Sequence, residues 1–457
     1  MTDEKSEKKK KNNLGTRTDK KPSGKAHSSL HSARGHSYTL MGTLLEDEYK
    51  HFAQQESIKK EGKTINKIVL GKGSFGTVRL AQDEASGLFL VVKKIKPSKA
   101  KAKLTPEDLD KLEIEQEIHE AIQQHQIKGT LSAIDIIRTV SSKNEETIYQ
   151  IFPLASRGDG SNFIEKIAFN SGSKNKELVP HLLLILAKTF ADLHEHHIYH
   201  RDLKPENILI TSQYEVTVAD FGSAVIYGEQ GKVQAYPNGD VMHNPPEFVK
   251  RSPTDTTYTP IPVSYTEEDR IRLVDSWKLG FALAPFIHPD IYEITKKLLP
   301  LPLMDSIPHA TRLQEYRNFH CELSDKLDEL GYSDEVKEAL LGLLNLDYTN
   351  RLTPIEVLTL LCSQDLAQNL EAVISNSAKQ LSQLLAEAFA YAEMTNETPK
   401  PSSSSASSSL FSPSPPPQKP IRSKTGADGY EIFYTDDELS DLEPDPDKSE
   451  PSSGAQP

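Results

Sequence analysis

The sequence is poor in the residues and runs that define several classes of protein. Among 457 residues there are only two cysteines, Cys321 and Cys362, too few for a disulfide framework or a cysteine-rich zinc site. This usage is typical of a reducing compartment. No apolar run reaches the roughly 18 residues that cross a bilayer, and no apolar stretch follows the lysine-rich start. We therefore expect a soluble protein of the cytoplasm or nucleus, without a membrane span or an N-terminal export signal.

Hydrophobic residues are also scarce, at 36% of the chain, and the two ends are the poorest parts. Residues 1–37 hold ten Lys or Arg against four acids. Residues 401–457 hold 14 Ser and 10 Pro, with ten acids against four bases. Segments of this composition bury too little apolar surface to offset the entropy of folding. We expect a disordered basic arm over 1–37 and a disordered acidic tail over 397–457.

Positive charge is in deficit between these ends. The formal net charge is -13, and because the local charges of the two ends cancel, residues 38–400 carry all of it. An acidic body is a poor candidate for non-specific binding of nucleic acid. A lysine run in a flexible arm is most often a solvated face, although binding of a polyanion by this arm stays open. Nucleic acid is therefore an unlikely partner.

A glycine-rich turn is the first motif in the middle of the chain. Gly71, Gly73 and Gly76 have the spacing G-x-G-x-x-G. A dinucleotide-binding loop has the same spacing but runs into a helix, whereas Val78 and Leu80 here continue a β-rich run. The pattern predicts strand, glycine turn and strand. It indicates either a flap whose amides close over phosphate groups or an ordinary glycine-rich hairpin.

A lysine follows within the next predicted strand, 88–95. With a strand period of two, Lys93 shares a face with Val91 and Ile95, so it needs an anionic partner unless it is an edge lysine that reaches solvent. A helix is predicted over 104–126, because Thr105-Pro-Glu is a helix start and apolar residues recur at helical spacing. That helix offers three acidic partners for the lysine: Glu115, Glu117 and Glu120.

The most specific motif lies at 198–210, Ile-Tyr-His-Arg-Asp-Leu-Lys-Pro-Glu-Asn-Ile-Leu-Ile. Asp220-Phe-Gly follows eighteen residues after Asp202. In these residues the sequence resembles the eukaryotic-type serine/threonine protein kinase family. The resemblance continues in Pro245-Pro-Glu, in Asp275-Ser-Trp-Lys-Leu-Gly and at Arg351, and it spans about 65–362.

The resemblance implies an α+β, bilobal protein kinase fold. It consists of a β-rich N-lobe at about 65–155 with one regulatory helix and a mainly helical C-lobe at about 156–362. We expect a helical lead-in over 38–64 and a helical C-terminal extension over 363–396. The apolar stripe of this extension either packs back on the kinase domain or binds a regulatory partner.

The resemblance also implies the reaction and its cofactors. The γ-phosphate of ATP would pass to Ser or Thr hydroxyls of a protein substrate, with Mg²⁺, or alternatively Mn²⁺, as the metal ion. Lys93 would bind the α- and β-phosphates and pair with Glu117. This glutamate is chosen because Glu117-Ile, with Ile122 and His125 after it, fits the family spacing E-I-x-x-L-x-x-x-H, with Glu120 second.

The catalytic loop would supply the remaining chemistry. Asp202 would accept the proton of the substrate hydroxyl, and Lys204 would contact the γ-phosphate. Asn207 and Asp220 would hold the metal ion, because amide and carboxylate oxygens suit Mg²⁺.

The residues around the nucleotide are assigned by the same resemblance. Phe75 would shield the γ-phosphate, Phe152 would be the gatekeeper, Pro153 and Ala155 would bond adenine through their backbone, and Asp159 could reach the ribose. The full set is Leu70, Gly71, Gly73, Ser74, Phe75, Gly76, Val78, Val91, Lys93, Phe152, Pro153, Ala155 and Asp159.

Several further residues would have structural roles. His200 and Asp275 would brace the catalytic loop, and Arg201 would dock a phosphorylated activation segment. A buried ion pair would join Glu247 to Arg351, and Trp277 would lie in the core.

Three features depart from the family pattern. Asp240 stands where the family has a threonine seven residues before the Glu247 position, no Ser or Thr occurs over 224–244, and Val91 replaces an alanine. Activity that needs no activation-loop phosphorylation, or activation by a partner, would account for the second feature. The alternative is a pseudokinase-like scaffold that acts by binding partners. The acidic tail also resembles, in composition, kinase effectors that intracellular bacteria deliver into the host cell cytoplasm.

Overall fold

The computed structural model describes fourteen segments of the chain: 16–19, 28–41, 54–60, 63–73, 76–95, 105–140, 146–165, 175–228, 241–248, 266–303, 307–362, 369–397, 422–425 and 431–434. The chain divides into two units, Met1–Thr398 and Pro399–Pro457.

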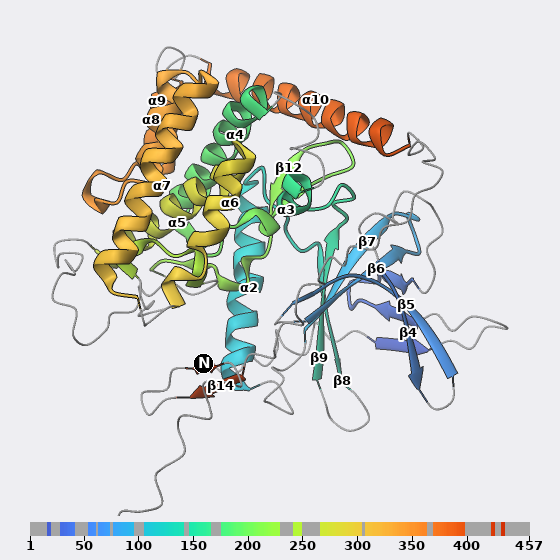
Figure 1. The fold of residues 1–457 in the computed structure, drawn as a ribbon. Helices are drawn as coiled ribbons and strands as arrows, with labels where there is room; N and C mark the ends of the chain where they lie inside the picture. The colour runs from blue at the N-terminus through green and yellow to red at the C-terminus, as the bar shows by residue number, and fades with distance from the viewer. Residues whose placement is uncertain are drawn as a thin grey trace, which may run out of the picture. The chain divides into compact units, whose positions relative to one another are not determined.

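Nine strands of the first unit form one sheet (Figure 1). Their order is β1-β2-β3-β6-β7-β9-β8, with β5 also paired to β6 and β4 to β5. The strands are β1 (Thr16–Asp19), β2 (Ser28–His31), β3 (Ser37–Leu40), β4 (Gln54–Lys60), β5 (Lys63–Gly73), β6 (Gly76–Asp83), β7 (Phe89–Ile95), β8 (Asp135–Val140) and β9 (Glu146–Pro153). The sheet confirms the predicted β-rich N-lobe.

The glycine motif joins β5 to β6 as an antiparallel hairpin. Gly73 lies opposite Gly76, and the register shifts between Val69 and Gly71. β6 then continues as a strand that pairs along β7, so the strand, turn and strand order predicted from the sequence is confirmed.

The first strands of the sheet correct two predictions. β3 pairs with β6, and the side chains of Leu30, Tyr38 and Leu40 are buried in one cluster with residues of β6, β7, β8 and β9. The structure thus has β1 and β2 within the segment 1–37 that was predicted to be disordered, and β3 and β4 where a helical lead-in was predicted. A strand needs an apolar residue only at alternate positions, so three large side chains are enough to hold two short strands on a sheet.

The remainder of the first unit is mainly helical, as predicted. Its helices are α2 (Pro106–His125), α3 (Gly160–Phe163), α4 (Asn175–Glu195), α5 (Glu267–Leu283), α6 (Pro289–Leu298), α7 (His309–Leu330), α8 (Asp334–Leu343), α9 (Pro354–Leu361) and α10 (Leu370–Glu397). Two small strand pairs accompany them, β10 (Ile198–Tyr199) with β13 (Val225–Ile226) and β11 (Ile208–Ile210) with β12 (Val216–Val218). The largest apolar core lies among these helices and includes Trp277, as predicted.

Helix α2 begins where the sequence indicates. The Thr105 hydroxyl accepts from the backbone N–H of Asp108 at 3.2 Å, and the Asp108 carboxylate accepts from that of Thr105 at 2.9 Å. This capping box satisfies two N–H groups at the helix start.

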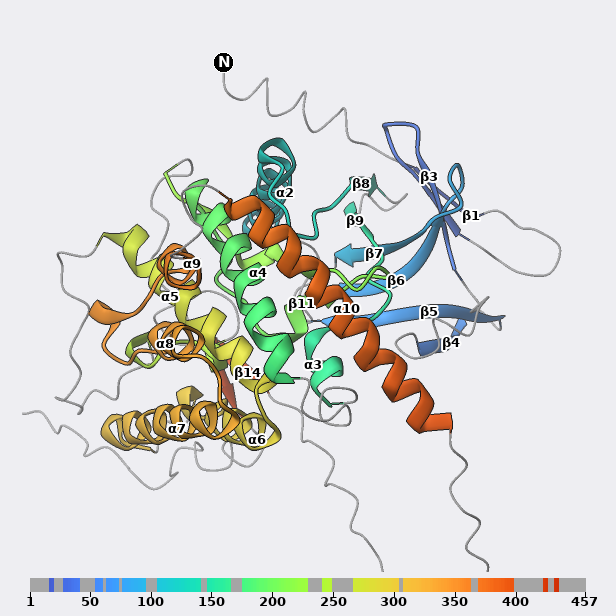
Figure 2. The ribbon, with the colours of Figure 1, turned by 90° about the horizontal axis from the view of Figure 1, so that it is seen from above.

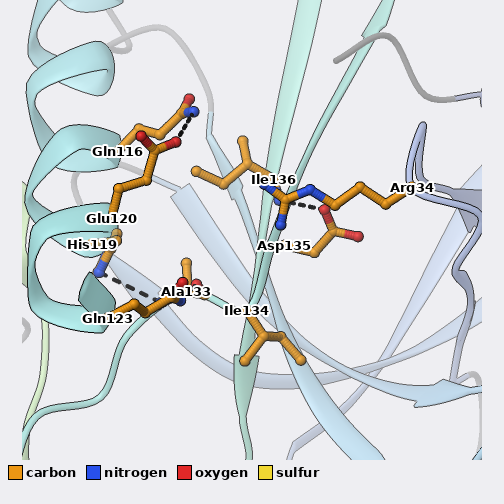
Figure 3. A pocket seen from close by; sticks show the side chains of 9 residues that line it. All are labelled: Arg34, Gln116, His119, Glu120, Gln123, Ala133, Ile134, Asp135 and Ile136. Atoms are coloured by element: carbon orange, nitrogen blue, oxygen red, sulfur yellow. Dashed lines mark hydrogen bonds between the residues drawn. The ribbon is translucent and has the colours of Figure 1, made fainter. Parts of the chain in front are cut away.

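Beside α2, Arg34 from the turn between β2 and β3 lines a small polar pocket with Glu120 and Asp135 (Figure 3).

The predicted helical extension is α10, which lies along α4 in both views (Figures 1 and 2). Its buried stripe, Leu381, Leu385, Ala388, Phe389 and Ala392, belongs to the core of the helical part. The His181 ring bonds the Ser377 hydroxyl at 2.9 Å across this contact. Of the two interpretations offered by the sequence, packing on the kinase domain is the one observed.

The second unit contains an antiparallel hairpin, β14 (Arg422–Thr425) with β15 (Glu431–Tyr434). The predicted disorder over 397–457 is therefore wrong at these two strands. Glu-Ile-Phe-Tyr in β15 has high strand propensity, unlike the Ser, Pro and acidic residues that set the average composition.

Candidate active site

The predicted phosphate-binding lysine lies on β7 between two carboxylates. The Nζ atom of Lys93 is 2.9 Å from Oδ1 of Asp220 and 3.3 Å from Oε1 of Glu115. Strand β7, helix α2 and the Asp220-Phe-Gly segment therefore meet at one cation. The lysine side chain is 15% exposed and that of Glu115 5%, so the pair is largely shielded from water.

The partner of Lys93 on α2 is Glu115 and not Glu117, which corrects the residue chosen from the sequence. Two residues along a helix turn the side chain by about 200°, to the other side. Glu117 is partly exposed, whereas Glu115 is buried. Both glutamates are possible partners from the sequence, but matching the family spacing to Glu117 puts the ion pair two residues too late on the helix.

Burial and charge oppose each other at this pair. Burial alone would raise the pKa of Glu115, but the charge of Lys93 and the His119 ring lower it to about 2. Burial would lower the pKa of Lys93, yet Glu115 and Asp220 raise it above its ordinary value. Both groups are therefore charged at neutral pH, as a lysine that binds phosphate requires.

The catalytic loop is held by one buried carboxylate on α5. Asp275 accepts from the backbone N–H groups of His200 at 2.8 Å and Arg201 at 2.7 Å, and it bonds the His194 ring at 3.1 Å. Burial would raise the pKa of Asp275, but these partners lower it. The bonds fix Arg201 in the left-handed conformation, φ 62°, which strains a residue other than glycine. The bracing roles predicted for His200 and Asp275 are consistent with these contacts.

The predicted base, Asp202, lies between two ammonium groups. Lys204 Nζ is 3.6 Å from Oδ2, and Lys278 Nζ is 3.9 Å from Oδ1. The carboxylate is 11% exposed and Lys278 is fully buried. Lys278 was not singled out from the sequence; the available signal was a cation inside the apolar run Trp-Lys-Leu-Gly-Phe.

The two predicted metal ligands have the chemistry that Mg²⁺ needs. The amide nitrogen of Asn207 donates to the Asp202 carbonyl at 2.7 Å, which leaves the amide oxygen as the ligand atom. The Asp220 side chain is 41% exposed and keeps its carboxylate beside Lys93. One amide oxygen and one carboxylate form a hard, oxygen-only donor set.

Aromatic rings connect these parts behind the site. The Phe221 ring lies 5.8 Å from the ring of His119 on α2 and 4.9 Å from the ring of His200. The His119 ring also contacts Phe152, centroid to centroid 5.6 Å. The sequence pattern did not identify His119, because its spacing on α2 is that of any core position. These edge-to-face contacts connect helix α2 to both catalytic motifs.

The predicted adenine pocket is built from β5, β6, β7 and β9. Val91 pairs with Phe152 across β7 and β9, and Phe152 is buried at 8% exposure. Leu70 and Leu154 both pack against the buried pair of Met41 and Leu80. Pro153 ends β9, with Ala155 two residues later. Val78 lies on β6, while Ser74 and Phe75 lie outside the described residues.

Asp159 is placed differently from the ribose-binding role inferred for it. It caps α3, where its carboxylate accepts from the Asn162 backbone N–H at 2.8 Å and from the Asn162 side chain at 2.9 Å. Both carboxylate oxygens therefore already have donors.

The activation segment is described at its two ends. Arg201 donates to the Ser223 carbonyl at 2.8 Å, and burial, opposed by Asp275, lowers its pKa to about 10. At the far end, Arg351 forms the predicted buried ion pair with Glu247, through two hydrogen bonds. Asp240 lies outside the described residues.

Comparison with known proteins agrees with this arrangement. Residues 65–361 match the protein kinase domain. The chain is 28% identical over 233 residues to serine/threonine-protein kinase cds1 of Schizosaccharomyces pombe, which covers 50% of this chain and 46% of that protein. It is 30% identical over 220 residues to NUAK family SNF1-like kinase 2 of Homo sapiens, covering 48% and 30%.

A third relative is serine/threonine-protein kinase Aurora-1 of Arabidopsis thaliana, 25% identical over 252 residues, which are 52% of this chain and 74% of that protein. The chain spans less than half the length of the first two relatives. Among the described helices, none has both the length and the hydrophobicity to cross a membrane.

Proposed function

Because the chain belongs to the protein kinase family, we propose that it is an ATP-dependent serine/threonine protein kinase. The observation that carries the proposal is the Lys93 ammonium held by both Glu115 and Asp220. In protein kinases the lysine–glutamate pair and the DFG aspartate must both be in place for phosphate transfer. The names of its relatives support serine or threonine as the acceptor.

The nucleotide would lie between the sheet and the catalytic loop. Gly71, Gly73 and Gly76 would bring backbone amides to the phosphates, and Lys93 would neutralise the α- and β-phosphates. The apolar residues Leu70, Val78, Val91 and Phe152 would enclose adenine, with Pro153 and Ala155 offering backbone groups. Asp159 remains a proposed ribose contact only if ribose replaces Asn162 at its carboxylate.

Asn207 and Asp220 would hold Mg²⁺, which neutralises phosphate charge when bound. The oxygen of the substrate hydroxyl would bond the γ-phosphorus while the bond from the γ-phosphorus to ADP breaks. Asp202 would accept the proton that this hydroxyl loses. Lys204, at 23% exposure, can turn from Asp202 toward the γ-phosphate.

We also propose a domain organisation. Residues 65–361 would be the catalytic domain, and the strands before it and helix α10 after it would brace it. Because the buried stripe of α10 faces the core, a regulatory partner would bind another face of this helix.

The experiment is a phosphate-transfer assay with a mixed peptide library, Mg²⁺ and ATP. The wild type should phosphorylate Ser or Thr, with turnover on the order of 1 to 100 per second if it is typical. Asp202→Asn should lower turnover at least about 1,000-fold and keep nucleotide binding. Nucleotide binding without transfer by the wild type would instead indicate a scaffold.

A further inference from the structure

Lys278 is an exceptional residue within helix α5. Its side chain is fully buried, and its neighbours in sequence, Trp277 and Leu279, are core residues. A lysine is almost never fully buried unless it is paired, because removing an ammonium from water is costly. A charge in this place therefore indicates a specific anionic partner.

The structure shows the carboxylate of Asp202 as one such partner. Lys278 approaches Oδ1 at 3.9 Å while Lys204 approaches Oδ2 at 3.6 Å. The two lysines differ in mobility: Lys204 comes from the loop itself and is 23% exposed, whereas Lys278 is enclosed by the helical core. One cation can leave the carboxylate and the other cannot.

The same helix also holds the backbone of this loop. Asp275, one turn before Lys278, accepts from the N–H groups of His200 and Arg201. Residues three apart share a helix face. Helix α5 thus presents an anion to the loop backbone and a cation to the loop's acidic side chain.

We propose that Lys278 is a positioning residue that fixes the Asp202 carboxylate for phosphate transfer. The proposal rests on the proposed role of Asp202 as the base. When Lys204 turns to the γ-phosphate, Lys278 remains as the counter-charge, so the carboxylate keeps its orientation toward the acceptor hydroxyl. A fixed charge beside the reacting group needs no rearrangement during the step.

The kinetic test compares full-length Lys278→Met with Lys188→Met. Lys188 is also an ion-paired lysine on a helix, bonded to Asp192, but it lies on α4. Lys278→Met should lower kcat at least about tenfold and change the KM for ATP less than about twofold, since only the proton-accepting group is affected. Lys188→Met should leave both unchanged. An unchanged kcat in folded Lys278→Met would overturn the proposal.

A thermal unfolding cycle tests the pair without any activity. Asp202→Asn and Lys278→Met should each lower Tm, and the double variant should be more stable than the sum of the two losses predicts, because both buried charges are then gone. Additive losses would contradict the pairing. If Lys278→Met does not fold, Lys278→Gln replaces it.

The two measurements separate the proposals. A wild type that binds ATP but transfers no phosphate would defeat the proposed function, whereas the unfolding cycle would still decide whether Lys278 and Asp202 interact.

Discussion

At the scale of single residues, Glu115 and Glu117 lie on the same helix, and it is Glu115 that forms the ion pair with Lys93. We predict that Glu115→Gln lowers kcat/KM for ATP at least about tenfold, because the lysine loses the charge that holds it for the phosphates. Glu117→Gln is the matched control on the same helix and should stay within about twofold of the wild type. Steady-state kinetics of the two variants tests this assignment. A larger loss in Glu117→Gln than in Glu115→Gln would mean that Glu117 is the functional partner of Lys93.

The same pair makes stability depend on pH. The pKa of Glu115 is about 2 in the folded state against an ordinary value of 4.5, so the folded state favours the ionised form. This contribution is complete above about pH 4.5 and is lost as the pH falls toward 2. His119, Lys93 and Asp220 are the charged or titratable groups that surround it.

We therefore predict that the free energy of unfolding of wild type exceeds that of Glu115→Gln by a margin that shrinks on acidification. The margin should be on the order of 2 kcal/mol at pH 7 and should narrow below about pH 4.5. Urea unfolding from pH 7 down to pH 3 measures it. A margin that does not change with pH would show that the carboxylate charge is not the stabilising feature.

Short sequence motifs predicted Asp202, Lys204, Asn207 and Asp220 as one group, because the first three lie on one loop and the pairing of β11 with β12 brings Asp220 back beside it. These motifs did not identify the correct residue where its identity depends on the side of a helix or on a contact between residues distant in sequence. Glu115 and Glu117 differ only in which side of α2 they occupy. Lys278 reaches Asp202 from a helix 76 residues away.

At the scale of elements, the buried stripe of helix α10 includes one aromatic residue, Phe389. The Phe389 ring lies 5.7 Å from those of Phe163 and Tyr214, and the Arg157 guanidinium lies 5.7 Å from it. Phe389 is 9% exposed, whereas Met394 on the same helix is 64% exposed. The helix therefore carries its own matched control.

We predict that Phe389→Ala lowers the free energy of unfolding by about 3 kcal/mol, since a buried ring is replaced by a cavity. Met394→Ala should change it by less than about 0.5 kcal/mol. Chemical denaturation of the two variants tests this. Equal, small losses would mean that α10 is held by its other contacts.

Elements with a local signal were predicted well, and those held by distant partners were not. The capping box of Thr105 and the glycine spacing of β5 and β6 are readable from neighbouring residues. β2 and β3 have no such signal. Leu30 and Tyr38 are buried because they pack against residues of β6, β7 and β8, which are distant in sequence.

At the scale of the whole molecule, elements that precede and follow the protein kinase domain in sequence pack against it. The early strands join the sheet through β6, and Tyr38 donates to Asp135 on β8 at 3.0 Å. Helix α10 closes the helical part, whereas the residues after 398 form a separate unit.

We predict that removing residues 1–41 lowers Tm by roughly 5 °C or more, because the buried cluster of Leu30, Tyr38 and Leu40 is lost. Removing 399–457 should shift Tm by less than about 1 °C. Differential scanning calorimetry on the two truncated proteins is the measurement. An unaffected Tm after the first deletion would show that the early strands do not stabilise the domain.

We propose above that the site transfers phosphate to Ser or Thr with Asp202 as the base. Phosphosite-resolved mass spectrometry of the full chain, incubated with Mg²⁺, ATP and a mixed peptide substrate, tests it most directly alongside Asp202→Asn. We expect phosphoserine or phosphothreonine in the peptides incubated with the wild type, and none in those incubated with Asp202→Asn. Equal phosphorylation by both proteins, or none by a wild type that binds ATP, would contradict it.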